Sequence, residues 1–294
     1  MKTAVVFSGQ GSQAVSMGYD FYQAFPQAKE VFEEVDETLQ FPLSDLIFKG
    51  PAEKLNQTQY AQPAIMAVSM AIWRVAHPAC HFMAGHSLGE YSALCAAQAL
   101  SLQDTAALLW QRGQAFSAVQ GCMLVILGLP LDKIKNIARQ TNTFVANENS
   151  GLQTTISGTR ENVEKADALA RLSGSKHTVM LSVSGPFHSP LMTPAQQTMA
   201  PLIQQVHMQT PAVPVVSNVD AQPVTKPEEI KQKLIEQIVC PVKWQSCIQT
   251  LVNQGVEQFI EIGAGRILTG LIKRINPDVK TCAVTSIKDL DNLS

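Results

Sequence analysis

A G-x-S-x-G pattern, formed by Gly85, Ser87 and Gly89, constrains this chain more than any other feature of its sequence. Residues 81–84 before it have the pattern of a short strand, and residues 88–100 after it are small, apolar and alanine-rich. A strand that turns sharply into a helix at such a pattern forms a nucleophile elbow, in which small flanking residues avoid a clash. The sequence therefore predicts Ser87 as a nucleophile at a helix N-terminus, where N–H groups face developing negative charge.

The rest of the chain alternates between strand-like and helix-like segments. Apolar runs at residues 3–7, 213–217 and 256–262 predict further strands, and helical spacing covers residues 19–39 and 63–75. The segment from Ser101 to Asp104 has the form of a capping box for a helix that runs to about residue 119. This alternation predicts an α/β fold with a mostly parallel sheet.

The order of elements changes between residues 121 and 184. The pattern there is strand, helix, strand, strand, helix, strand, which is the split βαβ order of a ferredoxin-like unit. We therefore expect residues 121–184 to form a small subdomain inserted into a larger α/β domain, which comprises residues 1–120 and 185–294.

Composition excludes several classes of protein. With 46% hydrophobic and 16% charged residues among 294, the chain is typical of a globular protein and not of a disordered one. The net charge of -2 and the lack of any long Lys/Arg block argue against a nucleic-acid partner. The N-terminal apolar run is too short for a secretory signal, and residues 64–76 are too short to span a bilayer. We expect no membrane association and a cytoplasmic location.

The six cysteines do not suggest a metal site. None forms a C-x-x-C pair, and none lies in a Cys/His cluster with the spacing of metal ligands. Buried, reduced thiols are the expected state.

A serine nucleophile needs a base, and two histidines are candidates. His86 is adjacent to Ser87, but on a tight elbow its side chain is expected to point away from the serine. His188 lies in a loop just after the small subdomain, between Pro186 and Pro190, and functional residues favour such loops. No carboxylate is an obvious third member. Asp220 lies in a turn that nothing ties to His188, and a main-chain or amide carbonyl could orient the imidazole instead.

Arg112 lies among apolar and small residues of a predicted helix. It could be a surface arginine on the polar side of that helix. Alternatively, a partly buried guanidinium could bind a carboxylate through two parallel hydrogen bonds.

Two glycine turns follow predicted strands. Gly9, Gly11 and Ala14 fit G-x-G-x-x-A, a dinucleotide-binding pattern, but large amides crowd the turn and no acidic residue lies at the required spacing. A turn that directs the main-chain N–H of Gln10 toward the active site is the better interpretation. The turn at residues 263–265 is expected to be structural.

Several motifs in one order resemble the malonyl-CoA:acyl carrier protein transacylases, including the stand-alone acyltransferases that serve polyketide synthases. The resemblance covers almost the whole chain. It rests on Gly9-Gln10-Gly11-Ser12-Gln13, Gln62-Pro63-Ala64, Gly85-His86-Ser87-Leu88-Gly89-Glu90, Gln111-Arg112-Gly113, Pro186-Phe187-His188-Ser189, Pro241-Val242-Lys243-Trp244 and Glu261-Ile262-Gly263. It implies a hydrolase-like α/β core with the ferredoxin-like insertion, and an active site in the cleft between them.

The resemblance also implies roles for individual residues. Ser87 attacks the thioester, His188 is the base, and the main-chain carbonyl of Gln237 receives the other imidazole proton. The N–H groups of Gln10 and Leu88 form the oxyanion hole. Arg112 pairs with the malonyl carboxylate, with Gln62, Phe187 and Met123 in the same pocket, and the aromatic Phe187 favours malonyl over branched groups. Coenzyme A thioester is the substrate, and no metal or redox cofactor is implied.

The sequence departs from the family's commonest form at a few positions. Ser8 and Ala264 each stand where proline is usual, and Cys240 precedes Pro241 where a polar or small residue is common. None of these removes a catalytic group.

Two alternatives remain open at this point. One is a hydrolase of the same fold that clears acyl groups from carrier proteins, and the other is a non-catalytic docking module. The pathway, fatty acid or polyketide, is undetermined, and a monomer is expected. Basic residues of the small subdomain are candidates for contact with an acidic carrier, or form only a solvated face: Lys133, Lys135, Arg160, Lys165, Arg171 and Lys176.

Overall fold

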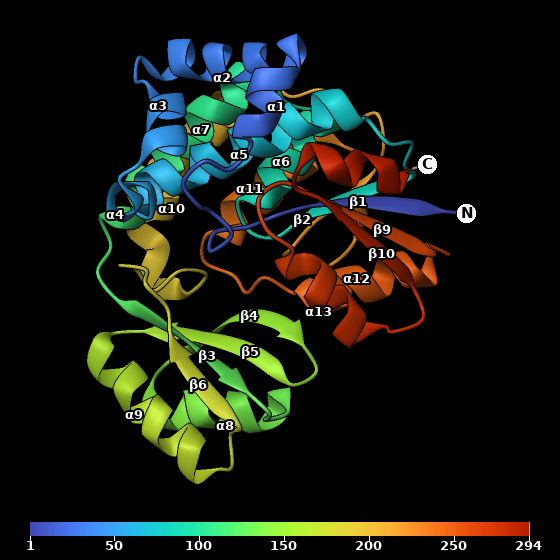
Figure 1. The fold of residues 1–294 in the computed structure, drawn as a ribbon. Helices are drawn as coiled ribbons and strands as arrows, with labels where there is room; N and C mark the ends of the chain where they lie inside the picture. Colours follow the sequence, from blue (N-terminus) through green and yellow to red (C-terminus); the bar gives the residue numbers. More distant parts are fainter. Residues whose placement is uncertain (294) are drawn as a thin grey trace.

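Two sheets organise residues 1–293 of the computed structural model, the part of the chain that the structure describes (Figure 1). The larger sheet has the strand order β10-β9-β1-β2-β7-β8, and its neighbours are parallel except for the antiparallel pair β7–β8. Its strands are β1 (Thr3–Phe7), β2 (Phe82–Gly85), β7 (Val215–Val216), β8 (Pro223–Val224), β9 (Gln258–Ile262) and β10 (Lys280–Val284). The prediction of an α/β fold with a mostly parallel sheet is confirmed.

Helices cover both faces of the larger sheet. Successive residues of a strand point to opposite faces, so Val5 and Phe7 of β1 enter one hydrophobic core while Ala4 and Val6 enter the other. Both cores are closed to water, which explains why β1 is apolar at every position after Thr3.

The first core is formed by helices that cluster on one side of the sheet (Figure 1). They are α1 (Tyr19–Ala24), α2 (Pro26–Leu39), α3 (Leu43–Lys49), α4 (Ala52–Leu55), α5 (Thr58–Ala76), α6 (Gly89–Ala96), α7 (Leu102–Ser117), α10 (Thr193–Gln205) and α11 (Pro227–Gln237). The second core is formed by α12 (Trp244–Asn253) and α13 (Ile267–Ile275). Short 3-10 helices occur at Pro190–Met192 and Ile287–Leu293.

The smaller sheet is antiparallel throughout and has the order β4-β5-β3-β6. Its strands are β3 (Cys122–Leu127), β4 (Phe144–Ser150), β5 (Gln153–Gly158) and β6 (His177–Met180). Two amphipathic helices, α8 (Leu131–Thr141) and α9 (Arg160–Leu172), pack their apolar sides on one face and form a third core with β3 and β5. Figure 1 shows this unit in green and yellow below the larger sheet.

Main-chain hydrogen bonds join the smaller unit to the part of the chain that contains the larger sheet. Glu148 N donates to Val242 O at 2.9 Å, and Val242 N donates to Ala146 O at 2.9 Å. These bonds attach β4 to the segment that connects α11 with α12. Gly121 N donates to Ser184 O at 3.0 Å, so the two chain crossings into and out of the smaller unit lie side by side.

The structure corrects several boundaries that the sequence suggested. The helix expected over residues 19–39 is two helices, because Phe25 precedes Pro26 and adopts an extended conformation (φ -128°, ψ 115°). The strand expected over residues 213–217 contains only Val215–Val216. The helix after the capping box is confirmed as α7, whose Asp104 N–H donates to Ser101 Oγ at 2.9 Å. No pattern predicted α3 or β10.

The described part of the chain, residues 1–293, contains no helix that is both long and apolar enough to cross a membrane. All six cysteines are free. Within the same residues, no three His, Cys, Asp or Glu side chains cluster in a way that could hold a metal ion.

Candidate active site

The turn between β2 and α6 has the geometry of a nucleophile elbow. Ser87 lies between the end of β2 at Gly85 and the start of α6 at Gly89, and its φ of 56° is in the left-handed region. A Cβ at Gly85 would lie 1.9 Å from the carbonyl oxygen of Gly89, and one at Gly89 would lie 2.3 Å from that of Phe7. Only glycine fits at either position, which is the steric reason for the G-x-S-x-G pattern.

Asn218 holds this turn in place. Its Oδ1 accepts a hydrogen bond from Ser87 N–H at 2.8 Å, and its Nδ2 donates to the carbonyl of Gly85 at 2.8 Å. Its own N–H donates to Glu90 Oε2 at 3.1 Å. One buried amide thus fixes both sides of the strained serine, and strain at such a site persists only where neighbours enforce it. Asn218 was not among the residues that sequence patterns singled out. The sequence signal that could have pointed to it is the position of an asparagine directly after a predicted strand.

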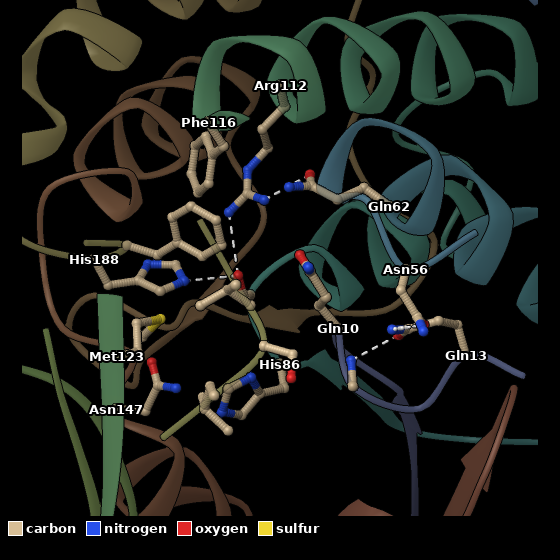
Figure 2. Close-up of a pocket in the computed structure, with 16 residues that line it drawn as sticks. Gln10, Gln13, Asn56, Gln62, His86, Arg112, Phe116, Met123, Asn147 and His188 are labelled. Atoms are coloured by element: carbon tan, nitrogen blue, oxygen red, sulfur yellow. Dashed lines mark hydrogen bonds between the residues drawn. The ribbon is translucent and has the colours of Figure 1, made fainter. Parts of the chain in front are cut away.

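Ser87, His188 and Gln237 form a chain of hydrogen bonds. Figure 2 shows its first bond as the dashed line that starts at the His188 ring. The distance from Ser87 Oγ to His188 Nε2 is 2.7 Å, and that from His188 Nδ1 to the main-chain oxygen of Gln237 is 2.8 Å. A carbonyl oxygen can only accept, so the proton is on Nδ1 and the free Nε2 accepts from the serine hydroxyl. This arrangement can remove the proton from Ser87 as it attacks an electrophile.

Burial and charge keep His188 neutral. The residue is 3% exposed, and its φ of 56° is again in the left-handed region. Burial, with the Arg112 charge nearby, lowers the pKa of His188 to about 3. An imidazole with this pKa is unprotonated at neutral pH and is available as a base.

We therefore expect the acid limb of the pH profile of kcat/KM to lie at a pH far below the ordinary pKa range of an imidazole. Since the lowered pKa of His188 leaves the base neutral, kcat/KM should not fall between pH 7 and pH 5. Stopped-flow measurement of acyl loading across this range tests the prediction. A one-proton loss of kcat/KM with its midpoint near 6.5 would contradict it.

Arg112 is buried beside the nucleophile. The residue is 1% exposed, so the surface alternative considered for it is wrong. Its Nη1 donates to Gln62 Oε1 at 2.7 Å, and its Nη2 donates to Ser87 Oγ at 3.2 Å and to Gln237 Oε1 at 3.0 Å. The guanidinium carbon lies 4.1 Å from the centre of the Phe116 ring. Among residues 1–293, no carboxylate forms an ion pair with Arg112, and such a buried cation is suited to bind an anionic ligand.

These side chains surround a cavity of about 320 Å³. Figure 2 shows Arg112 and Gln62 on one side of it, His188 and Met123 on another, and Gln10 across from them. Its lining includes the predicted residues Ser87, Arg112, His188, Gln10, Gln62, Met123 and Phe187. The cavity therefore brings together the nucleophile, the base and the cation that the sequence singled out.

The two predicted oxyanion donors belong to two different turns of the chain. Gln10 lines the cavity from the turn after β1, and Leu88 follows Ser87 at the start of α6. In the same turn, Gln13 Oε1 accepts a hydrogen bond from Gly11 N–H at 2.8 Å. The chain's own glutamine thus occupies an N–H group that a dinucleotide phosphate would need.

Two residues weighed as members of a triad lie elsewhere. His86 Nε2 lies 2.9 Å from Asn149 Oδ1, and burial lowers the pKa of this imidazole. Its ring nitrogen is therefore engaged away from Ser87. Asp220 forms an ion pair with Lys233, not with His188. The main-chain carbonyl of Gln237 occupies the place that a carboxylate would take.

Half of the candidate basic residues on the smaller unit are paired within their own helix. Arg160, Lys165 and Arg171 each form an ion pair with an acidic residue one turn away on α9, namely Glu164, Glu161 and Asp167. This pairing favours a solvated helix face at these three positions over a free basic patch.

The turn at residues 263–265 has a structural role. Ser8 Oγ donates to the carbonyl of Ala264 at 3.1 Å and to Glu261 Oε1 at 3.3 Å. Gly263 has a φ of 131°, and a Cβ there would lie 2.6 Å from Ser69 Oγ. These contacts connect the turn to Ser8, the residue after β1, which supports the expected structural role.

Comparison with known proteins agrees with this geometry. A family model described as the acyl transferase domain matches residues 4–293. The malonyl CoA-acyl carrier protein transacylase of Bacillus subtilis is 42% identical over 99% of this chain and 95% of its own. The crystal structure of the acyl-carrier-protein S-malonyltransferase from Bartonella henselae is 42% identical with a TM-score of 0.97, and 99% and 98% of the two chains are covered.

A third structure contains a malonyl-transacylase in complex with a type II polyketide synthase acyl carrier protein. It is 37% identical, with a TM-score of 0.96, over 100% of this chain and 99% of the other. Such sequence identity over nearly the full length of both compared chains shows membership of one family and not only a shared fold. The chain belongs to the acyl transferase family, among the malonyl CoA-acyl carrier protein transacylases.

Proposed function

We propose that this enzyme moves a malonyl group from malonyl-CoA to the phosphopantetheine thiol of an acyl carrier protein, through an acyl-Ser87 intermediate. One observation carries the proposal: the nucleophile lies 2.7 Å from a neutral base and 3.2 Å from a buried guanidinium in the same cavity. The names of the relatives support the same substrate and acceptor. The reaction is therefore ping-pong, with two half-reactions on one serine.

In the first half-reaction, Ser87 Oγ attacks the thioester carbonyl while His188 Nε2 takes the hydroxyl proton. The carbonyl of Gln237 keeps the other imidazole nitrogen protonated and stabilises the imidazolium that forms. The N–H groups of Gln10 and Leu88 are the proposed oxyanion donors, and one such donor contributes on the order of a hundredfold or more. His188 then protonates the leaving thiolate. The second half-reaction reverses these steps with the carrier thiol.

The position of Arg112 explains the choice of acyl group. In a malonyl thioester, one methylene separates the reacting carbonyl from the free carboxylate. A guanidinium that contacts Ser87 Oγ is within reach of that carboxylate when the serine attacks the carbonyl. Gln62 and Gln237 hold the guanidinium in this position through their amide oxygens.

Phe187 and Met123 are proposed to limit the width of the pocket. Both line the cavity, and the Phe187 ring packs against that of Phe116 with 4.9 Å between centres. This tilted ring contact holds the Phe187 ring in place where an α-methyl branch would need space. Malonyl is therefore proposed over branched groups.

The remaining features belong to the same proposal. We assign residues 1–120 and 185–294 to a hydrolase-like core and residues 121–184 to an inserted ferredoxin-like subdomain, supported by the strand order β4-β5-β3-β6.

The reaction uses no metal or redox cofactor. A monomer is proposed because one chain supplies every residue of the site. Six free thiols support a reducing, cytoplasmic location.

The experiment that tests the function separates transfer from hydrolysis. The protein is incubated with malonyl-CoA, methylmalonyl-CoA or acetyl-CoA, with and without a holo carrier protein, and both free acid and acylated carrier are quantified. We expect malonyl-carrier to form with little free malonate, and much less transfer of the other two groups. Rapid release of malonate with no malonyl-carrier would favour a hydrolase that clears carrier proteins.

A further inference from the structure

A buried carboxylate that the mechanism above does not use lies behind the nucleophile. Glu90, in the first turn of α6, is 2% exposed. Its Oε2 accepts hydrogen bonds from Gln237 Nε2 at 2.7 Å and from Asn218 N–H at 3.1 Å. An ionisable group buried this deeply is costly unless it is hydrogen-bonded and balanced by an opposite charge.

The side chain of Gln237 connects Glu90 to Arg112. Its Nε2 donates to Glu90, to the Ser87 carbonyl at 3.1 Å and, more weakly, to Asn218 Oδ1 at 3.5 Å. Because Nε2 faces these acceptors, Oε1 faces Arg112 Nη2 at 3.0 Å. One amide therefore separates the buried carboxylate from the buried guanidinium. The main chain of the same residue accepts from His188 Nδ1.

We propose that Glu90 is a positioning residue and proton-linked counter-charge: ionised, it balances Arg112 through Gln237 in the empty site, and it takes up a proton from solvent when the malonyl carboxylate occupies Arg112. The proposal rests on the proposed function, because it requires a malonyl group at Arg112. The acyl transfer itself is unchanged. The C–S bond breaks, the Ser87 ester forms, and the serine proton leaves on the thiol of coenzyme A through His188.

The charges around Glu90 give the direction of the effect. Burial raises the pKa of Glu90 to about 7, while the hydrogen bonds from Gln237 and Asn218 and the Arg112 charge lower it, and Asp220 raises it. Tyr91 on the same helix and Cys247 on α12 face it as neutral groups, since burial raises the pKa of each. His188 is also neutral, because its pKa is lowered.

Malonyl loading removes one of the influences that keep Glu90 ionised. A malonyl carboxylate on Arg112 neutralises the cation whose charge lowers the pKa of Glu90. The pKa then rises above its empty-site value of about 7, so near neutral pH the loaded enzyme binds more protons than the empty enzyme. By linkage, malonyl affinity weakens as pH rises above 7.

Proton uptake during loading tests this in the wild-type protein. The protein is mixed with malonyl-CoA in weakly buffered solution at pH 7 with an indicator dye, and adduct formation is followed by intact mass. We expect uptake of about half a proton per malonyl-Ser87 formed, because a group with a pKa near 7 is half ionised in the empty site. Complete adduct formation without uptake overturns the inference, whereas no adduct at all overturns the proposed function.

Glu90→Gln removes the charge and leaves the hydrogen-bonding oxygen. The glutamine Oε1 can still accept from Gln237 and Asn218, so the positions of Arg112 and His188 are kept. We expect this variant to form the adduct without proton uptake, and its KM for malonyl-CoA to stay constant between pH 6.5 and 8. The wild-type KM should rise several-fold over that range.

Glu236→Gln is the matched control, because Glu236 lies next to Gln237 on α11 and its side chain bonds only to Gln232 among the described contacts. This variant should keep both the proton uptake and the pH dependence. Retention of uptake in Glu90→Gln, or a loss of kcat in that variant that is equal at every pH, overturns the proposed role.

Discussion

Replacement of Ser87 by alanine is expected to abolish the acyl-enzyme and to lower malonyl transfer on the order of 10⁴-fold or more, because no other group can form the ester. The substitution removes Oγ, which contacts His188 and Arg112, and leaves the main-chain N–H that binds Asn218. The elbow should therefore persist. Steady-state transfer to a holo carrier protein measures the loss.

Ser92→Ala is the matched control for this substitution. Ser92 is a fully buried serine on α6, the helix that follows Ser87, and its Oγ finds no hydrogen-bond partner among the described residues. Its loss should leave transfer within about twofold of the wild type. Substantial transfer by Ser87→Ala, or an equal loss in Ser92→Ala, would contradict the role of Ser87.

Replacement of Arg112 by alanine is expected to lower kcat/KM for malonyl-CoA by about 10²–10³-fold, the equivalent of about 3–4 kcal/mol of lost charge-assisted binding. Loading from acetyl-CoA should fall much less, because an acetyl group has no carboxylate for Arg112 to bind. The ratio of malonyl to acetyl loading therefore falls. Competition between the two thioesters, read by intact mass, measures this ratio.

Gln111→Ala, at an exposed position next to Arg112 on α7, should leave the ratio unchanged. Arg112→Ala also leaves the amide oxygens of Gln62 and Gln237 without their donor, so a fall in thermal stability is expected. A variant in which malonyl and acetyl loading decrease equally would show that Arg112 only maintains the fold.

The residues that we propose to contact the substrate are ones that the sequence had singled out. Ser87 could be predicted because a G-x-S-x-G turn requires glycine on both sides, and the structure gives the reason in the close approaches of Gly85 and Gly89. His188 could be named as a candidate because it lies in a loop just after the small subdomain, and the resemblance to the transacylases implied that Arg112 binds the malonyl carboxylate. The sequence did not show that these residues line one cavity, and this became clear only from the fold.

The residues that support the site could not be found in this way. Asn218 and Glu90 are 128 positions apart and meet only because β7 lies beside β2 in the sheet. For Gln237, the resemblance implied only a main-chain carbonyl, and nothing indicated that the side chain bridges Glu90 and Arg112. Such contacts depend on tertiary packing that no local pattern encodes.

Local structure was predicted where periodicity was long, and missed where elements are short. The helix α3 has only seven residues, and β10 is an edge strand whose sequence begins with Lys280 and Thr281. The single helix expected over residues 19–39 failed because apolar spacing continues across Pro26, while the backbone before a proline does not. The pattern over residues 19–39 was overridden by the constraint at Pro26, whereas no sequence pattern predicted α3 or β10.

Intact-protein mass spectrometry of a single turnover is the most direct test of the acyl-serine mechanism. The protein is mixed with one equivalent of malonyl-CoA, its mass is recorded, and a holo carrier protein is then added. We expect the protein to gain one malonyl group on Ser87, and this group to move quantitatively to the carrier so that the original mass is restored. A protein that never gains the group while the carrier is still malonylated would contradict the acyl-serine mechanism.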